Sequence, residues 1–397
     1  MQINVGIVGA GIIGSAIAFE LSRRGVTGIH VYDPDLEGSL SSTERNAGGV
    51  RHLWQHPINI ELSRASISLF ERIREEIGFQ QTGYLWLFEK EKATQGETLL
   101  AHTKKSHLNY EQWSVSDIRN RYPFIDKTDD LAFGLFGPKD GVINSNALKN
   151  FYRSESKKKG VVFHDRSWVT RISERNSVHF HVHEPESSEQ ALKLLRDPRV
   201  EKQTEMAREA KSLILSAGAW MSELLNPLLP TTEVKPVRRQ ISIFKAENFD
   251  MTPYGMVVDT SRVYFHPEGG NMLGGFVLKA ETPGFRFEYD NDFFENFIWP
   301  PLFERSTCFE RLKHISGWAG LYSYTPDTSG ILGRLQGYKN IFEAHSFTGR
   351  GIMQSYGAAV ALAELMMDGS YRTIDASYLS RERFSDEKRL LRENLHI

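Results

Sequence analysis

Near the start of the chain lies Gln2-Ile3-Asn4-Val5-Gly6-Ile7-Val8-Gly9-Ala10-Gly11-Ile12-Ile13-Gly14, and this stretch decides how the chain begins to fold. The apolar, β-branched run over 3–8 predicts a buried strand that stops at the glycines. An Ala-rich amphipathic run over 15–24 predicts a helix, which Gly25 ends in the manner of a C-cap. We therefore expect a strand, a tight glycine turn and a helix in immediate succession.

The same stretch has the spacing of a dinucleotide-binding turn. A second apolar run over 29–32 ends at Asp33, nineteen residues past the last glycine. In a βαβ unit of this kind Gly9 permits the tight turn, Gly11 lets the backbone approach a pyrophosphate, and Gly14 lets the helix pack close to the strand. The helix N-terminus supplies free N–H groups to the phosphates. This spacing does not separate FAD from NAD, whereas Asp33 argues against NADP because it would repel a 2′-phosphate.

Composition places the chain among ordinary soluble proteins. It has 397 residues, 40% of them hydrophobic and 25% charged, which predicts two or three domains. The net charge of −2 gives no reason to expect a nucleic-acid partner. A single cysteine, Cys308, excludes an internal disulfide framework and a Cys-rich metal centre, and we predict no metal site. The chain has no apolar run of roughly 18 residues and opens directly into a strand, so we expect a cytoplasmic protein without signal peptide or transmembrane segment.

The middle of the chain has a different pattern. Strand-like runs between 234 and 323, with Gly269-Gly270-Asn271 suited to a hairpin turn, predict a mainly antiparallel sheet with a helix around 290–304. Residues 184–210 are polar and charged and look like an inserted surface excursion that is partly helical. An apolar helix over 353–367 follows the loop Ser346-Phe347-Thr348-Gly349-Arg350-Gly351.

Seven motifs occur in a fixed order along nearly the whole chain. They are Gly9 to Gly14 with Asp33, Ser41-Ser42…Asn46-Ala47-Gly48-Gly49-Val50-Arg51, Gln81-Thr82-Gly83-Tyr84-Leu85, Asp140-Gly141, Ala217-Gly218-Ala219-Trp220, Gly317-Trp318-Ala319-Gly320-Leu321-Tyr322-Ser323-Tyr324-Thr325-Pro326-Asp327, and Gly349-Arg350-Gly351-Ile352-Met353. In these motifs the chain resembles the FAD-dependent D-amino-acid-oxidase superfamily. The branch it resembles most contains sarcosine oxidase, glycine oxidase and the β-subunit type of L-proline dehydrogenase. The motifs are specific for the family and say little about the substrate.

This resemblance implies an α/β fold (α+β in two domains), in which a Rossmann-like FAD-binding domain is interleaved with a mainly antiparallel β substrate domain. The FAD-binding domain would comprise 1–80, 140–222 and 324–375, with 184–210 as an insertion. The substrate domain would comprise 81–139 and 223–323, and 376–397 would form a C-terminal tail. The resemblance also selects FAD over NAD, because the second Gly-rich loop would direct a helix N-terminus at the pyrimidine edge of a flavin.

The resemblance further implies which residues touch the FAD. They belong to the first glycine turn, to the loop that crosses the flavin, and to the strand ends and the helix that face it. These residues are Gly9, Gly11, Ile12, Ile13, Gly14, Asp33, Pro34, Ser41, Ser42, Asn46, Ala47, Gly48, Gly49, Val50, Val169, Ala217, Gly218, Trp220, Gly320, Gly349, Arg350, Gly351, Ile352 and Met353.

Four side chains are implied as catalytic or substrate-binding. Arg51 follows the loop that crosses the flavin, and an arginine there would clamp a carboxylate through two parallel hydrogen bonds. Tyr264 resembles the family tyrosine whose hydroxyl reaches the substrate. Tyr322 lies, with Tyr324, in the strand that edges the pocket, and His52 would tune the flavin.

Three departures from the sarcosine-oxidase pattern bear on the chemistry. Gly320 stands where those enzymes tether the flavin through a cysteine, which implies a non-covalent FAD. The stretch Leu273-Gly274-Gly275-Phe276 lacks the lysine that assists oxygen reduction there, and no lysine follows until Lys279. This implies a slow reaction with O2 and another, unknown electron acceptor. Met353 replaces a second carboxylate-binding lysine.

These features predict an FAD-dependent oxidoreductase that oxidises the C–N bond of a small amino or imino acid by hydride transfer from the α-carbon to flavin N5, as a dehydrogenase rather than a fast oxidase. Two alternatives stay open. One is a 2-hydroxy-acid dehydrogenase in which His52 or His266 takes the hydroxyl proton. The other is a flavin-bearing assembly or chaperone-like protein with vestigial activity, which the insertion at 184–210 would suit. A homo- or hetero-oligomer is also open.

Overall fold

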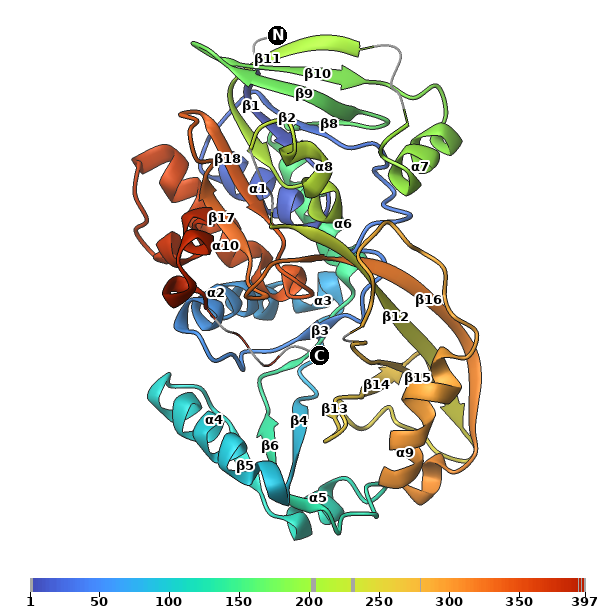
Figure 1. Cartoon of the computed structure of the whole chain (residues 1–397). Coiled ribbons are helices and arrows are strands. Elements are labelled where there is room, and N and C mark those ends of the chain that lie inside the picture. Colours follow the sequence, from blue (N-terminus) through green and yellow to red (C-terminus); the bar gives the residue numbers. More distant parts are fainter. Residues whose placement is uncertain are drawn as a thin grey trace.

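The computed structural model describes residues 3–200, 205–229, 233–278, 280–391, 393 and 395. Two large β-sheets organise these residues, one in the upper half and one in the lower half of Figure 1. The first sheet contains β1 (Ile3–Val8), β2 (Ile29–Tyr32), β8 (Val162–His164), β9 (Trp168–Glu174), β10 (Val178–His183), β11 (Glu205–Leu215), β17 (Ile331–Arg334) and β18 (Ile341–His345). The second contains β4 (Tyr84–Glu89), β5 (Glu111–Trp113), β6 (Leu131–Gly137), β12 (Lys235–Ala246), β13 (Met256–Val258), β14 (Tyr264–Glu268), β15 (Asn271–Gly275) and β16 (Leu312–Tyr324). A small ladder pairs β3 (Gly49–Val50) with β7 (Gly141–Val142).

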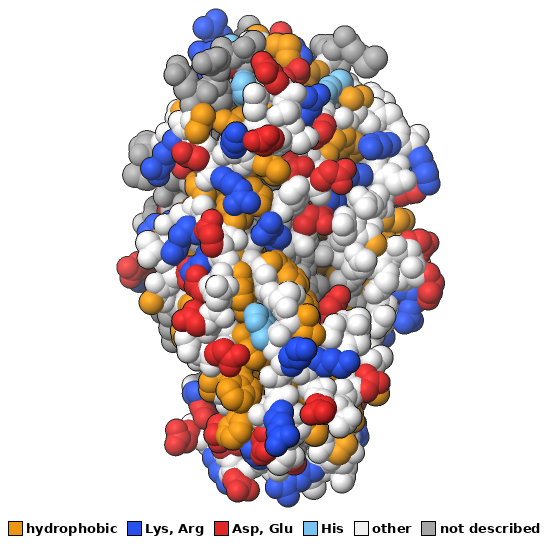
Figure 2. Space-filling model, turned by 90° about the vertical axis from the view of Figure 1, so that its right-hand side faces the viewer, with side chains coloured by type: hydrophobic (Ala, Val, Ile, Leu, Met, Phe, Trp, Pro, Cys, Tyr) orange, Lys and Arg blue, Asp and Glu red, His pale blue; other side chains and the backbone are white. Residues whose placement is uncertain are grey.

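Helices accompany both sheets. Those of the described residues are α1 (Ile12–Arg23), α2 (Pro57–Arg72), α3 (Arg74–Ile77), α4 (Ala93–Lys105), α5 (Val115–Arg121), α6 (Ser145–Lys158), α7 (Ser188–Arg196), α8 (Met221–Leu225), α9 (Trp299–Arg305) and α10 (Gly351–Asp368). In that part of the chain no helix is long and apolar enough to cross a membrane. On the face drawn in Figure 2, acidic and basic side chains are interspersed.

The first sheet is a parallel core with an antiparallel extension. Strands β18, β11, β1, β2 and β8 run parallel in that order, so the carboxyl ends of β18, β11, β1 and β2 meet at one edge. Helices α1, α2, α6 and α10 bury a shared apolar core beneath these strands. An added Cβ on Gly357 would lie 2.4 Å from the backbone oxygen of Leu62, so α10 and α2 approach at backbone distance. Ligands of such open sheets bind beyond the carboxyl ends of the strands.

The opening glycine turn has the predicted geometry. Gly9 has φ +96°, a conformation that side chains disfavour. A Cβ on Gly14 would lie only 1.9 Å from the carbonyl oxygen of Gly9, so the helix starts in backbone contact with the turn. Helix α1 ends at Arg23, and Gly25 follows with φ +88°. The predicted succession of strand, turn, helix and strand is therefore confirmed.

The second sheet is mainly antiparallel, as predicted, except that β13 pairs with β4 in parallel. Gly269 and Gly270, with φ of +55° and +79°, form the turn of the β14–β15 hairpin. One face of the sheet packs against α5, α9 and the π-helical turn over Phe294–Ile298. The other face turns toward the first sheet and carries Tyr84 and Tyr264. Every second residue of each strand therefore faces the space between the two layers.

Two expectations about the local structure differ from what is found. Residues 184–210 are not one surface excursion, because β11 begins at Glu205 and pairs with β10, with Phe180 opposite Arg208. One face of this strand segment is exposed and charged, which makes its sequence look like a loop. The helix expected over 290–304 is divided into the π-helical turn and α9, because Pro300 and Pro301 start a new helix.

Candidate cofactor and substrate site

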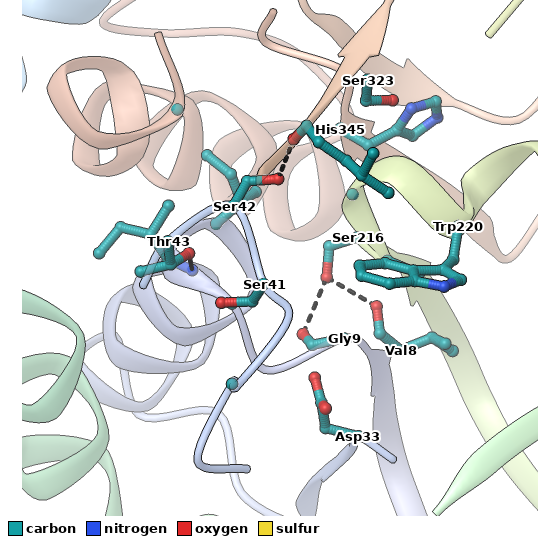
Figure 3. A pocket seen from close by; sticks show the side chains of 18 of the residues that line it. Val8, Gly9, Asp33, Ser41, Ser42, Thr43, Ser216, Trp220, Ser323 and His345 are labelled. Carbon is teal, nitrogen blue, oxygen red and sulfur yellow. Dashed lines mark hydrogen bonds between the residues drawn. The ribbon is translucent and has the colours of Figure 1, made fainter. Parts of the chain in front are cut away.

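A cavity of about 310 Å³ opens at the carboxyl edge of the first sheet. It is lined from β1 (Val8, Gly9), β2 (Tyr32, Asp33), β11 (Ser216, Ala217) and β18 (His345, Ser346) and from the loops that follow. Figure 3 shows Ser216 donating to the carbonyls of Val8 and Gly9 beside this space, with Asp33 and Trp220 nearby. The hydroxyl of Ser216 thus ties the end of β11 to the glycine turn of β1.

The glycine turn is shaped for an elongated anion. Gly11 is the N-cap of α1 and lines the cavity, and an added Cβ there would meet only Thr43 Oγ1, at 3.5 Å. The backbone of Gly11 is therefore open to a ligand, at the positive end of a twelve-residue helix. The hollow beside these glycines, which larger residues would fill with their side chains, fits the pyrophosphate of a dinucleotide.

Asp33 follows directly after β2 and faces the same cavity. Its carboxylate accepts hydrogen bonds from the backbone N–H of Ala10 at 2.6 Å and of Asp35 at 2.8 Å. Burial raises the pKa of Asp33 to about 6, although both N–H donors favour the ionised form. The geometry holds the carboxylate at the strand end, where an acid of this motif meets ribose hydroxyls.

A second helix N-terminus borders the cavity. Gly349, Gly351 and Ile352 line it, and they stand at the start of the eighteen-residue helix α10. A helix dipole directed there stabilises negative charge on a bound group. Arg350, the N-cap, instead donates to Ser329 and Thr328 and stacks on the ring of Trp54, so its side chain holds the loop in place. Burial lowers the pKa of Arg350 to about 10.

A buried chain of hydrogen bonds also ends at the cavity wall. Arg381 donates to Glu343, whose carboxylate meets His345 Nε2 at 2.9 Å. The other ring nitrogen of His345 lies 2.7 Å from Ser346 Oγ, which bonds Ser323 Oγ. Burial opposes ionisation of Glu343, but His345 and Arg381 outweigh it and lower the pKa of Glu343. These hydrogen bonds fix the hydroxyls of Ser323 and Ser346 on the cavity wall.

Helix α7 covers one side of the cavity. Leu195 at its end and Pro198 just after it line the space. The indole N–H of Trp220, another lining residue, donates to the carbonyl of Leu195 at 2.8 Å. The segment that looks like an insertion in the sequence therefore contributes a wall to the site.

The residues expected to touch the cofactor divide into two groups. Those that line the cavity are Gly9, Gly11, Ile12, Ile13, Asp33, Pro34, Ser41, Ser42, Asn46, Val169, Ala217, Gly218, Trp220, Gly349, Gly351 and Ile352. Those that lie outside its lining are Gly14, Ala47, Gly48, Gly49, Val50, Gly320, Arg350 and Met353. Gly14 acts from behind, by letting α1 pack on the turn.

A smaller cavity, of about 20 Å³, adjoins the large one and shares Ser42, Asn46, Leu321 and Tyr322 with it. Tyr264, Arg239 and Gly320 line it from the second sheet.

Glycines make room for the tyrosine rings of this region. A Cβ on Gly275 would lie 2.4 Å from the hydroxyl of Tyr264, and one on Gly349 would lie 2.6 Å from the ring of Tyr322. A side chain at either glycine would collide with one of these rings.

Arg51 is brought to this region but is already engaged. Its guanidinium donates to the carbonyl of Leu53 at 2.7 Å and to that of Leu395. It lies 3.7 Å from the ring centre of Trp54 and 4.9 Å from that of Trp86. Burial lowers the pKa of Arg51. The expected carboxylate clamp thus lies outside the lining of both cavities, with the carbonyl of Leu395 on one of its nitrogens.

His52 is held by Asp140. Its backbone N–H and its Nδ1 both meet Asp140 Oδ1 at 2.9 Å. Asp140 is fully buried and also accepts the hydroxyl of Tyr110. This cluster joins the Arg51 loop to β7, and His52 is not among the residues that line the cavity.

Several lining residues escape sequence reasoning. Ser216 and His345 stand at the ends of β11 and β18, so a rule that ligands meet the carboxyl ends of parallel strands would have found them once the strand order was known. Leu195 and Pro198 have no such signal, because only the folded chain brings α7 to the cavity.

Known proteins show the same architecture. The chain is 29% identical to the FAD-dependent oxidoreductase domain-containing protein 1 of Xenopus laevis, over 99% of this chain and 84% of that protein. It is 23% identical to the monomeric sarcosine oxidase of Bacillus sp. (strain B-0618), over 92% of each. The crystal structure of L-proline dehydrogenase from P. horikoshii superposes with a TM-score of 0.83 at 20% identity, covering 97% of this chain and 98% of that one.

The family model of FAD dependent oxidoreductases (DAO) matches residues 4–365. This range contains both helix N-termini at the cavity, the acid after β2 and the roof of the second sheet. The chain therefore belongs to the DAO family of FAD dependent oxidoreductases and is an enzyme with FAD as its cofactor, related to amino acid oxidases.

Proposed function

We propose that this enzyme oxidises the C–N bond of a small amino or imino acid and passes the electrons to an acceptor other than O2. The observation that carries the proposal is the small, enclosed cavity under Tyr264 and Tyr322, next to the cofactor cavity. It has room for one small polar group of a substrate whose remainder would lie in the cofactor cavity. Names of similar proteins, among them L-proline dehydrogenase and sarcosine oxidase, point to the same substrate class.

Bound FAD would supply the two-electron oxidant for this reaction. Gly9, Gly11 and Asp33 would hold its adenosine diphosphate end, and the N-terminus of α10 would stabilise negative charge at its ring end. The FAD would be non-covalent, because Gly320 offers no side chain, and Cys308 is exposed and does not line either cavity. The first sheet with its cofactor cavity and the second sheet that roofs the site would correspond to the two interleaved domains, with 376–397 as a tail.

The roof residues would position the substrate and exclude water. Tyr264 lines the small cavity, and burial raises the pKa of its hydroxyl well above the usual value, so the hydroxyl stays a neutral hydrogen-bond donor. Arg51 would take part only if the carbonyl of Leu395 gave way to a substrate carboxylate.

The preference for an acceptor other than O2 is supported by the two glycines at the end of β15. A Cβ on Gly274 would lie 2.9 Å from Phe244, and one on Gly275 would lie 2.4 Å from the hydroxyl of Tyr264. A side chain at either position would have to displace one of these aromatic rings, so the packing favours glycine over lysine there. Lys279 lies outside the described residues.

Anaerobic reduction of the bound flavin tests the proposal. Sarcosine, L-proline, glycine, D-amino acids and 2-hydroxyglutarate are added one at a time to the yellow holoenzyme, and the oxidised flavin band is followed. Bleaching by an amino or imino acid, with slow recovery in air, is the expected result. Bleaching by 2-hydroxyglutarate alone would contradict the C–N assignment, and immediate recovery in air would contradict the proposed acceptor. A flavin that only dithionite bleaches would refute the proposal.

A further inference from the structure

Two consecutive arginines of β12 have opposite surroundings. Arg238 points to one face of the sheet and forms ion pairs with Glu281 at 2.7 Å and Asp290 at 2.6 Å. Arg239 points to the other face, toward the cofactor layer, because successive residues of a strand alternate. Within the described residues Arg239 has no acidic partner, although it is only 9% exposed.

The guanidinium of Arg239 is held in place, but not all of its N–H donors have hydrogen-bond partners among the described residues. Its Nη1 donates to the carbonyl of Arg238 at 2.8 Å, and its charge lies 5.4 Å from the ring centre of Tyr322 and 5.1 Å from that of Tyr324. Its Nε has no hydrogen-bond partner in the described part of the chain. A buried cation with an unused donor is costly unless an anion completes it. The side chain lines the small cavity together with Tyr264.

Two other arginines near this cavity make more hydrogen bonds within the protein than Arg239 does. Arg45 lines it too, but its Nε donates to the carbonyl of Ser39 and its Nη1 to that of Ala319, both at 2.7 Å. Arg51 donates to two carbonyls and lies against two tryptophan rings. Of these three arginines, Arg239 is the one with a buried nitrogen, Nε, that has no hydrogen-bond partner among the described residues.

We propose that Arg239 binds the carboxylate of the substrate, with its acid group seated in the small cavity between Arg239 and Tyr264. This rests on the proposed function and names the residue that selects an acid over a neutral amine. The planar fork of a guanidinium suits a carboxylate, and the low dielectric of a buried site strengthens the pair.

Binding of an inert acid and its neutral analogue tests this without oxidation. Sodium propanoate and propanamide are titrated into the holoenzyme, and their dissociation constants are read from the change in the flavin absorption band. The wild type is expected to prefer propanoate at least tenfold. Arg239→Met should abolish the preference, and Arg239→Lys should retain part of it as a point charge without the fork. Exposed Arg119 provides the matched control, Arg119→Met, which should keep the full preference.

Arg51→Met separates the two candidate anchors. A preference that survives in Arg239→Met but vanishes in Arg51→Met overturns the proposal, and so does a wild type without any preference. If Arg239→Met does not retain FAD, Arg239→Gln decides by the same ratio. Failure of the proposed function gives a different pattern, in which the wild type prefers propanoate although no amino or imino acid reduces its flavin.

Discussion

Two glycines of the opening turn should fail for different reasons when each is replaced by alanine. At Gly14 an added Cβ would lie 1.9 Å from the carbonyl oxygen of Gly9, so the start of α1 must withdraw by about 1 Å to reach an allowed contact. Overpacking of this kind costs ~1–3 kcal/mol. Unfolding entropy of roughly 0.8 kcal/mol/K for a chain of 397 residues converts this to a melting temperature lower by about 1–4 °C.

At Gly11 the protein itself has room for a methyl group. The backbone has φ −64° and ψ −172°, which alanine adopts, and the nearest atom, Thr43 Oγ1, lies 3.5 Å from the added Cβ. Gly11→Ala should therefore leave the melting temperature of the FAD-free protein unchanged. The methyl group nevertheless projects where the pyrophosphate must approach, so the affinity for FAD should fall at least tenfold, about 1.4 kcal/mol.

The assay strips FAD from both variants and from the wild type, records the thermal unfolding of each, and then titrates FAD back by the quenching of its fluorescence. Both variants should bind FAD weakly, and only Gly14→Ala should also melt early. Normal FAD affinity in Gly11→Ala would refute the placement of the pyrophosphate. A Gly14→Ala protein as stable as the wild type would refute the packing argument.

Three further predictions concern buried contacts. Asp327 is almost fully buried and accepts a two-pronged bond from Arg383, so Asp327→Asn should lower stability by about 3–5 kcal/mol in chemical denaturation, whereas Asn at the exposed Asp129 should have no effect. Burial raises the pKa of Asp33 to about 6, so between about pH 4 and 6 this carboxyl is ionised in the unfolded chain but still protonated in the folded one. The free energy of unfolding of the FAD-free protein should therefore fall by about 3 kcal/mol as pH rises through this range, and Asp33→Asn should remove this part of the pH profile. Leu195→Ala should speed FAD release at least tenfold in stopped-flow dilution, because α7 covers the cavity; an unchanged rate would contradict that role.

Local signals in the sequence were sufficient for the elements that contact their own neighbours. The βαβ unit around Gly9, the hairpin at Gly269 and the final apolar helix each depend on turn chemistry or periodicity within about twenty residues, and the structure confirms them. The order of the family motifs then predicted the family and the FAD. The prediction for 205–210 was wrong because a strand segment with one solvent-exposed face can be as polar in sequence as a loop.

Only the tertiary structure decided which charged groups are satisfied. Arg51 and Leu395 are 344 residues apart in the chain, yet they share a hydrogen bond, so the most obvious carboxylate clamp is already occupied. Arg238 and Arg239 are neighbours of the same residue type. Because successive side chains of β12 point to opposite faces of the sheet, Arg238 lies among carboxylates and Arg239 faces the small cavity. Residue type is local information, whereas burial and partners depend on segments that meet only after folding, and these determine what an arginine can bind.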